Sequence, residues 1–204
     1  MIRKYSVLIC MVIAVILLVT ATLLYPGGSI SDRNSIGFNW SKNFISNLFA
    51  AKAINGLNNP GRVWAITGMA FQAVADGIFF IEMSKRIPVK HAAMLLKCIG
   101  AATIVFNFLI VTSLHDIMVT ISSTLSLIGL FYITVFILRT KLHFLKFSCI
   151  ICMLIFYYTL YLYGSGNWGL LAIMQKVSVI CSMLLVLSIA YFTKQEDFKQ
   201  SSKP

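Results

Sequence analysis

The stretch AAMLLKCIGAATIVFNFLIVTSLHDIMVTISSTLSLIGLFYITVFIL, residues 92–138, decides the fold of this chain. It holds two apolar blocks, 92–113 and 116–138, with only Leu114 and His115 between them. Each block is close to the ~20 residues that cross ~30 Å of hydrocarbon as a helix. So short a connection leaves room for a tight turn only. We therefore predict two antiparallel transmembrane helices.

Four further blocks of the same kind lie at 6–25, 63–83, 147–163 and 169–192. The chain has 204 residues, of which 59% are hydrophobic and 11% charged. A soluble domain carries about 25% charged residues, so this composition excludes one. We predict an all-α fold, a polytopic transmembrane bundle of six helices over residues 1–193. A polar cytoplasmic tail follows at 194–204, and we expect it to be disordered.

The basic residues indicate how the helices are oriented, because cytoplasmic loops carry an excess of Lys and Arg. With the amino terminus inside, the cytoplasmic segments hold Arg3, Lys4, Lys85, Arg86, Lys90, Arg139, Lys141, Lys146, Lys194, Lys199 and Lys203. The outer segments hold Arg33, Lys42, Lys52 and Arg62. We expect both termini in the cytoplasm and the protein in the cell (inner) membrane. The net charge of +11 is then explained by basic residues that contact anionic membrane lipids. We therefore expect membrane lipids as partners and no nucleic acid.

One long outer loop, at about 26–62, connects the first two predicted helices. Within it, Phe44, Ile45, Leu48 and Phe49 recur at helical spacing, and good helix formers follow them. This pattern favours a short amphipathic helix that lies at the membrane interface.

Polar side chains within the apolar blocks are the candidate site residues, since they are costly in hydrocarbon and usually face the bundle interior. Their spacing places several on shared helix faces. The predicted faces are Gln72 with Asp76; Gly100, Thr103 and Asn107; Asp116, Thr120 and Ser123; and Gln175, Ser178 and Ser182 with Lys176 beside them.

Depth estimates at about 1.5 Å per residue place Lys176 near the level of Asp116. We predict an ion pair between them, with His115, Gln175 and Asn107 close by, forming a polar pocket open to the outside. A structural clamp between helices is the alternative interpretation. Asp76 is predicted to lie deeper, nearer the inner third of the membrane, and its candidate partners are Thr103 and Lys97.

The sequence indicates no cofactor and no metal. The three histidines cannot form one metal site, because such a site needs three or more ligands. His91 and His143 are predicted on the side of the membrane opposite His115. The five cysteines all fall in or beside apolar blocks, which predicts small buried hydrophobic side chains. Cys149 and Cys152 have redox spacing, but on the reducing side of the membrane.

The chain resembles a family of bacterial six-span integral membrane proteins, domain of unknown function 998, over about residues 6–193. The resemblance rests on Phe44-Ile45-Ser46-Asn47-Leu48, on Asn55-Gly56 with Asn59-Pro60, on His115-Asp116, and on Gln175-Lys176. The family's Ser-Asp-Leu-Gly element is replaced here by Asn47 for the acid and Phe49 for the glycine. The resemblance implies six spans and no particular activity.

Three functions stay open at this point. The first is a membrane protein with an outward-facing pocket that binds a lipid headgroup or a small molecule, or that helps a protein partner, itself unknown, to assemble. The second is an intramembrane lipid hydrolase or transferase that uses Ser46, His115 and Asp116, and the third is a small proton-coupled transporter that uses Asp76. The candidate pocket residues are Ser46, Asn47, Gln72, Asp76, Asn107, His115, Asp116, Gln175 and Lys176.

Overall fold

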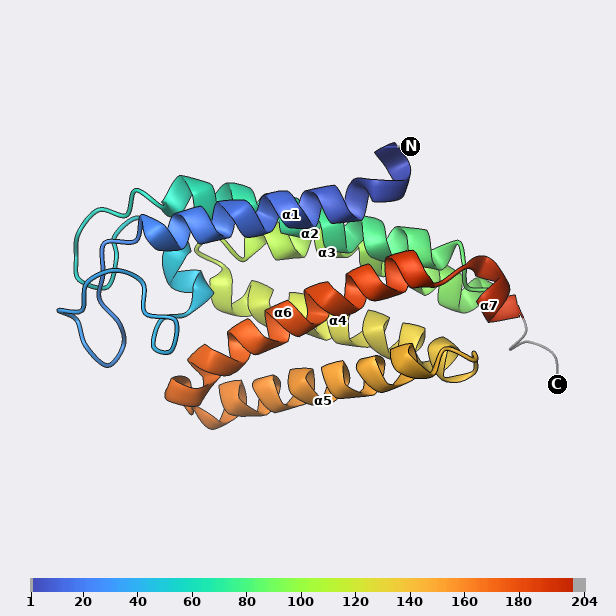
Figure 1. The fold of residues 1–204 in the computed structure, drawn as a ribbon. Helices are drawn as coiled ribbons and strands as arrows, with labels where there is room; N and C mark the ends of the chain where they lie inside the picture. Colours follow the sequence, from blue (N-terminus) through green and yellow to red (C-terminus); the bar gives the residue numbers. More distant parts are fainter. Residues whose placement is uncertain (1, 200–204) are drawn as a thin grey trace.

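A computed structural model describes residues 2–199, which form a bundle of long α-helices (Figure 1). The long helices are α1 (Ile2–Leu23), α2 (Arg62–Ser84), α3 (Lys90–Leu109), α4 (His115–Leu138), α5 (His143–Ser165) and α6 (Trp168–Phe192). Each of the six is long and apolar enough to cross a membrane. The all-α fold of six candidate spans is therefore confirmed, with helix ends within a few residues of those predicted.

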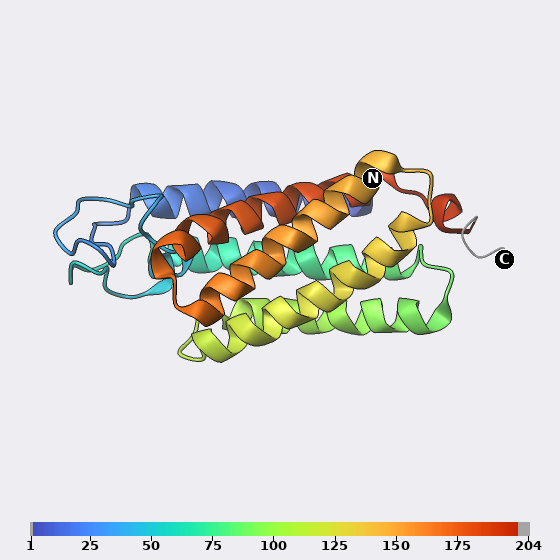
Figure 2. The same cartoon turned by 90° about the horizontal axis from the view of Figure 1, so that it is seen from below.

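The helices are arranged around α2, which packs against α1 and α3 to form one layer. Helices α4, α5 and α6 lie on one side of that layer, with α5 farthest from it (Figures 1 and 2). Chain neighbours run antiparallel, so residues 24–61 and the α3–α4 and α5–α6 turns lie at one end of the bundle. We call this the loop end. The amino end of α1 and the carboxyl end of α6 lie at the opposite end of the bundle, which we call the terminus end.

Helices α2 and α3 approach each other backbone to backbone at a pair of glycines. A Cβ added at Gly77 would lie 2.2 Å from Cγ1 of Ile104 and 2.7 Å from the carbonyl oxygen of Gly100. A Cβ at Gly100 would lie 2.8 Å from the carbonyl oxygen of Gly77. Small residues allow such close contact between membrane helices. The contact fixes the register of α2 against α3.

Towards the loop end α6 diverges from the α1–α2–α3 layer, and the long loop enters between them (Figure 1). The loop contains a short 3₁₀ helix, η1 (Ile45–Phe49). The predicted short helix is thus present, but as a single tight turn. Leu48 and Phe49 are buried, in a cluster with Tyr25 and Ala65. The apolar side of η1 therefore packs on the bundle.

Buried polar groups hold the rest of the loop in place. The amide of Asn59 donates to the carbonyl oxygens of Leu48 at 2.9 Å and Ala50 at 3.0 Å. The hydroxyl of Tyr25 accepts from the backbone N–H of Ile54 at 3.1 Å. Burial raises the pKa of Tyr25, and the Ile54 bond opposes this effect. These bonds satisfy loop backbone groups that would otherwise be costly to bury.

The start of the polar tail is ordered, contrary to the sequence-based prediction. Residues Gln195–Lys199 form a short helix, α7, and the side chain of Phe198 is 0% exposed. It packs in the main hydrophobic core at the terminus end. Burying one aromatic ring provides enough apolar contact to order this segment, whose other residues are polar. Residues 200–204 lie outside the described part of the chain.

The cysteines are free thiols, and their burial differs from the prediction at one position. Cys149 and Cys152 are buried in the core, and Cys10 and Cys181 are partly buried. Cys98 is exposed on the outer surface of α3. It therefore lies on a face that would contact lipid.

Candidate functional site

A cavity of about 600 Å³ lies at the loop end, between α4, α5 and α6 and beneath η1. Met69 of α2 and Ile110, just after α3, complete its wall. Its size falls within the ~300–1,000 Å³ typical of small-molecule sites. The divergence of α6 from the first layer, together with the turn of η1, creates this space.

Two of the polar stripes predicted from the sequence line this cavity. Asp116, Thr120 and Ser123 come from α4, and Gln175, Ser178 and Ser182 come from α6. Helical spacing placed each stripe on a single face, and the fold turns both faces towards the same space. Ser46 and His115, two further candidates, also line it.

Aromatic rings form the loop-end wall of the cavity, and the sequence-based reasoning missed them. Phe44 precedes η1, Tyr163 lies near the end of α5, and Trp168 begins α6. The Phe44 and Trp168 centroids are 6.5 Å apart at 89°, and those of Tyr163 and Trp168 are 5.9 Å apart at 86°. Both pairs are edge-to-face, a favourable geometry. We call these three residues the aromatic wall.

The imidazole of His115 has a defined tautomer. Its Nδ1 lies 2.8 Å from the carbonyl oxygen of Ile110. Because a carbonyl can only accept, Nδ1 carries the hydrogen and donates it. In the neutral ring the lone pair is then on Nε2, which can act as an acceptor or a base.

Lys176 does not pair with Asp116, which corrects the central contact predicted for the pocket. Its buried ammonium donates to the carbonyl oxygens of Asn43 and Ala172, and it lies 5.8 Å from the centroid of the Phe38 ring. Within residues 2–199 no ion pair joins it to a carboxylate. Ala172 belongs to α6 itself, whereas Asn43 is a loop residue, an acceptor that the helix spacing alone could not reveal.

Gln175, the neighbour of Lys176, also holds the loop. Its side-chain oxygen accepts from the backbone N–H of Ile45 at 2.9 Å. Gln175 and Lys176 therefore fix the segment at Asn43–Ile45 to α6 from two sides. This arrangement supports the alternative of a structural clamp, with the loop as the clamped element.

We expect Lys176→Met to lower the free energy of unfolding by about 1–3 kcal/mol, because it removes two hydrogen bonds and leaves the loop carbonyl of Asn43 without its donor. The loss should be additive with that of Asp116→Asn, since the two side chains share no partner. Unfolding of the single and double variants in detergent micelles measures both effects. A coupling above about 0.5 kcal/mol would show that the two charges interact.

Asp76 belongs to a separate polar network between α2 and α3. Its carboxylate accepts from the Gln72 amide at 2.9 Å and the Asn107 amide at 3.2 Å. The predicted partners Thr103 and Lys97 are wrong, as is the placement of Asn107 beside Lys176. The Thr103 hydroxyl and the Gln72 side-chain oxygen are buried without a hydrogen-bond partner. The α2–α3 register set by the paired glycines places Asn107 opposite Asp76.

Asn47 serves the loop and does not line the cavity. Its side-chain oxygen accepts from the backbone N–H of Phe44 at 2.7 Å. Asn43, which was not a candidate, has a fully buried side chain that donates to the carbonyl oxygen of Gly28 at 2.7 Å. The bond of Asn47 is local and typical of Asn in turns, whereas that of Asn43 joins two distant parts of the loop. Both residues shape the segment that covers the cavity.

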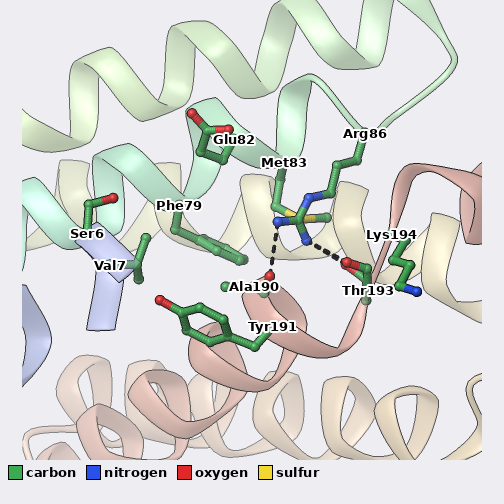
Figure 3. A pocket seen from close by; sticks show the side chains of 10 residues that line it. All are labelled: Ser6, Val7, Phe79, Glu82, Met83, Arg86, Ala190, Tyr191, Thr193 and Lys194. Atoms are coloured by element: carbon green, nitrogen blue, oxygen red, sulfur yellow. Dashed lines mark hydrogen bonds between the residues drawn. The ribbon is translucent and has the colours of Figure 1, made fainter. Parts of the chain in front are cut away.

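A second cavity of about 260 Å³ lies at the terminus end, between α1, α2 and α6 (Figure 3). Arg86 crosses it and donates to the carbonyl oxygens of Ala190 and Thr193, each at 3.0 Å, and to the Thr193 hydroxyl at 2.9 Å. Burial lowers the pKa of Arg86, and the charge of Glu82 opposes this effect. The guanidinium caps the last carbonyls of α6, so its role is structural.

The described residues contain no group of three His, Cys, Asp or Glu side chains that could hold a metal ion together.

Six apolar helices and a cavity at one end of the bundle define a multi-pass helical membrane protein. No family model, curated protein or solved structure matches the chain. The resemblance to the six-span family of unknown function therefore stays a prediction.

Proposed function

We propose that this multi-pass membrane protein binds an amphipathic small molecule, such as a membrane lipid, in the cavity beneath η1. The observation that supports this is the cavity's mixed lining. Phe156, Leu160 and Val179 provide apolar contact, while the stripes of α4 and α6 provide polar groups. Ligand sites in proteins combine these two features. A molecule with one apolar and one polar part fits such walls.

We further propose that the cavity faces outward. The basic residues expected in the cytoplasm belong to the terminus end, including Lys85, Arg86 and Lys141 near the turns of the bundle. The loop end carries fewer basic residues, and the positive-inside rule therefore favours an external loop end. In this orientation a ligand would enter from the outer leaflet or the external medium.

Filling the cavity should displace its ligand. We expect Ser123→Leu to reduce the amount of bound lipid or small molecule by about tenfold, equivalent to ~1.4 kcal/mol, because the larger side chain occupies ligand space. Native mass spectrometry of the protein extracted from membranes measures the occupancy. The mass of the released species distinguishes a lipid from another small molecule.

Ser126→Leu is the matched control, since Ser126 is on the same helix but does not line the cavity. Its occupancy should equal that of the unmodified protein. Equal occupancy in the Ser123 and Ser126 variants, or an empty unmodified protein, would contradict ligand binding at this site.

A lipid hydrolase or transferase is the second candidate, because Ser46 and His115 line the same cavity and Nε2 of His115 is free to accept a proton. In that case lipid breakdown products would accumulate with the unmodified protein and with His143→Asn, whose histidine lies at the terminus end. They would be absent with His115→Asn. Bound, intact lipid in all three proteins favours the binding function.

A transporter that works through Asp76 has less support. Both carboxylate oxygens of Asp76 already accept amide hydrogens, from Gln72 and Asn107. Such a network holds the carboxylate in one position. Asp76 also does not line the cavity, so the two sites are separate in this conformation.

A further inference from the structure

We propose that the polar group of the ligand is an organic cation, a quaternary or protonated amine, held by Asp116 and the aromatic wall. This inference rests on the proposed function, since it names the ligand class of the same cavity. Three independent features support it: the charge of the lining, the direction of its hydrogen-bonding groups and the arrangement of its aromatic rings.

Asp116 is the only formally charged residue among the described residues that line the cavity. It lies on the α4 face formed by His115, Val119, Thr120 and Ser123, all of which line the same space. No ion pair within residues 2–199 involves its carboxylate. A cationic ligand would gain a counter-ion here, whereas a phosphate or carboxylate would be repelled.

The amino end of α4 would normally attract an anion, because backbone N–H groups point outward there. Asp116 is in the first turn of α4 and already offsets this partial positive charge. The neighbouring ammonium of Lys176 does not serve the cavity either, since it donates to Asn43 and Ala172. The described lining residues therefore include no Lys or Arg side chain that could bind an anionic headgroup.

Half of the hydroxyl groups that line the cavity present acceptors. The hydroxyl hydrogens of four lining residues are donated to carbonyl oxygens of their own helices, in Thr120, Thr124, Thr159 and Ser182. Their oxygen lone pairs stay available, and Nε2 of His115 is a further acceptor. Such a lining suits a ligand that donates hydrogen bonds or carries positive charge.

The aromatic wall lies at the same end of the cavity as Asp116. In each edge-to-face pair the edge of one ring covers one face of the other, so the remaining ring faces are left for contact with a ligand. Quaternary ammonium groups bind over aromatic faces, Trp being the strongest partner. A carboxylate and three such rings at one end of the same cavity can combine charge attraction with cation–π contact.

The experiment compares ligand charge, with the cation and its neutral analogue matched in shape. The probes are benzyltrimethylammonium, its uncharged carbon isostere neopentylbenzene, and the anion benzenesulfonate. The full chain is studied in uncharged maltoside micelles with Trp40→Phe and Trp64→Phe, so that Trp168 alone reports binding by fluorescence. We expect the cation to bind about tenfold more tightly than the isostere, and the anion most weakly.

Two carboxylate variants complete the test. Asp116→Asn keeps the shape of the side chain and should remove the preference for the cation. Asp32→Asn removes one negative charge from an exposed loop position and keeps the oxygen that accepts from Asn34, so it should leave the preference unchanged. An unchanged preference in Asp116→Asn would overturn the inference.

The outcomes separate this inference from the proposed function. Equal binding of cation and isostere, with both blocked by Ser123→Leu, would overturn the cationic ligand while the cavity site stands. Tightest binding of the anion would likewise overturn the cationic ligand and leave the cavity site standing. Failure of all three probes would overturn the cationic ligand, and the lipid occupancy of Ser123→Leu then decides separately whether the cavity binds any ligand.

Discussion

Gly77→Leu is expected to destabilise the protein by more than about 3 kcal/mol, at or beyond the upper end of overpacking effects. The added Cβ would lie 2.2 Å from Cγ1 of Ile104 and 2.7 Å from the Gly100 carbonyl oxygen. The second of these is backbone and cannot rotate away, so α2 and α3 must separate. Separation would also break the hydrogen bond between Asn107 and Asp76. Unfolding in detergent micelles, followed by loss of helical circular dichroism, measures the change.

Gly169→Leu is the matched control, because it makes the same chemical change in the first turn of α6. A Cβ at Gly169 meets nothing within 4 Å. Leu is also a better helix former than Gly, so the control should be neutral or slightly stabilising. Similar stability of the two variants would show that α2 and α3 do not meet at the paired glycines.

Phe198→Ala is expected to cost about 3–5 kcal/mol, the usual cost of removing a fully buried Phe ring. Phe198 is 0% exposed and packs in the core cluster that contains Ile133, Ile137 and Ile189. The substitution would leave a cavity at the terminus end and release α7. Thermal unfolding measures the stability, and protease cleavage after Lys194 or Lys199 measures the release.

Phe192→Ala provides the comparison, since this last residue of α6 is 72% exposed. Its effect should stay within about 0.5 kcal/mol, as for other surface positions. Equal losses for Phe192→Ala and Phe198→Ala would show that α7 does not dock. In that case the tail would be disordered, as its polar composition suggested.

The positions of the helices could be predicted because the signal is local. Each apolar block is about as long as a bilayer is thick, and a helix satisfies its own backbone hydrogen bonds without any partner. Helical periodicity likewise places Asp116, Thr120 and Ser123 on one face. Neither conclusion depends on where the other helices lie.

The partners of the polar residues could not be predicted in this way. Depth counted along each helix placed Asn107 with Lys176 and Asp116, but the contact between Gly77 and Gly100 shifts α3 so that Asn107 meets Asp76. Lys176 donates to the Asn43 carbonyl of the loop, and the loop has no periodicity from which its path could be predicted. The aromatic wall could not be predicted for the same reason, because it brings a loop residue, Phe44, against residues at the ends of two helices.

The sequence by itself determined the six membrane-length helices, their antiparallel order and the polar faces of α4 and α6, because hydrophobic length and 3.6-residue periodicity are properties of each segment alone. Only the tertiary structure decided that these faces enclose a cavity beneath η1, that Lys176 clamps the loop, and that Phe198 orders the tail. These contacts depend on the rotation and relative shift of whole helices. Close packing between distant segments sets both, and no single segment encodes them.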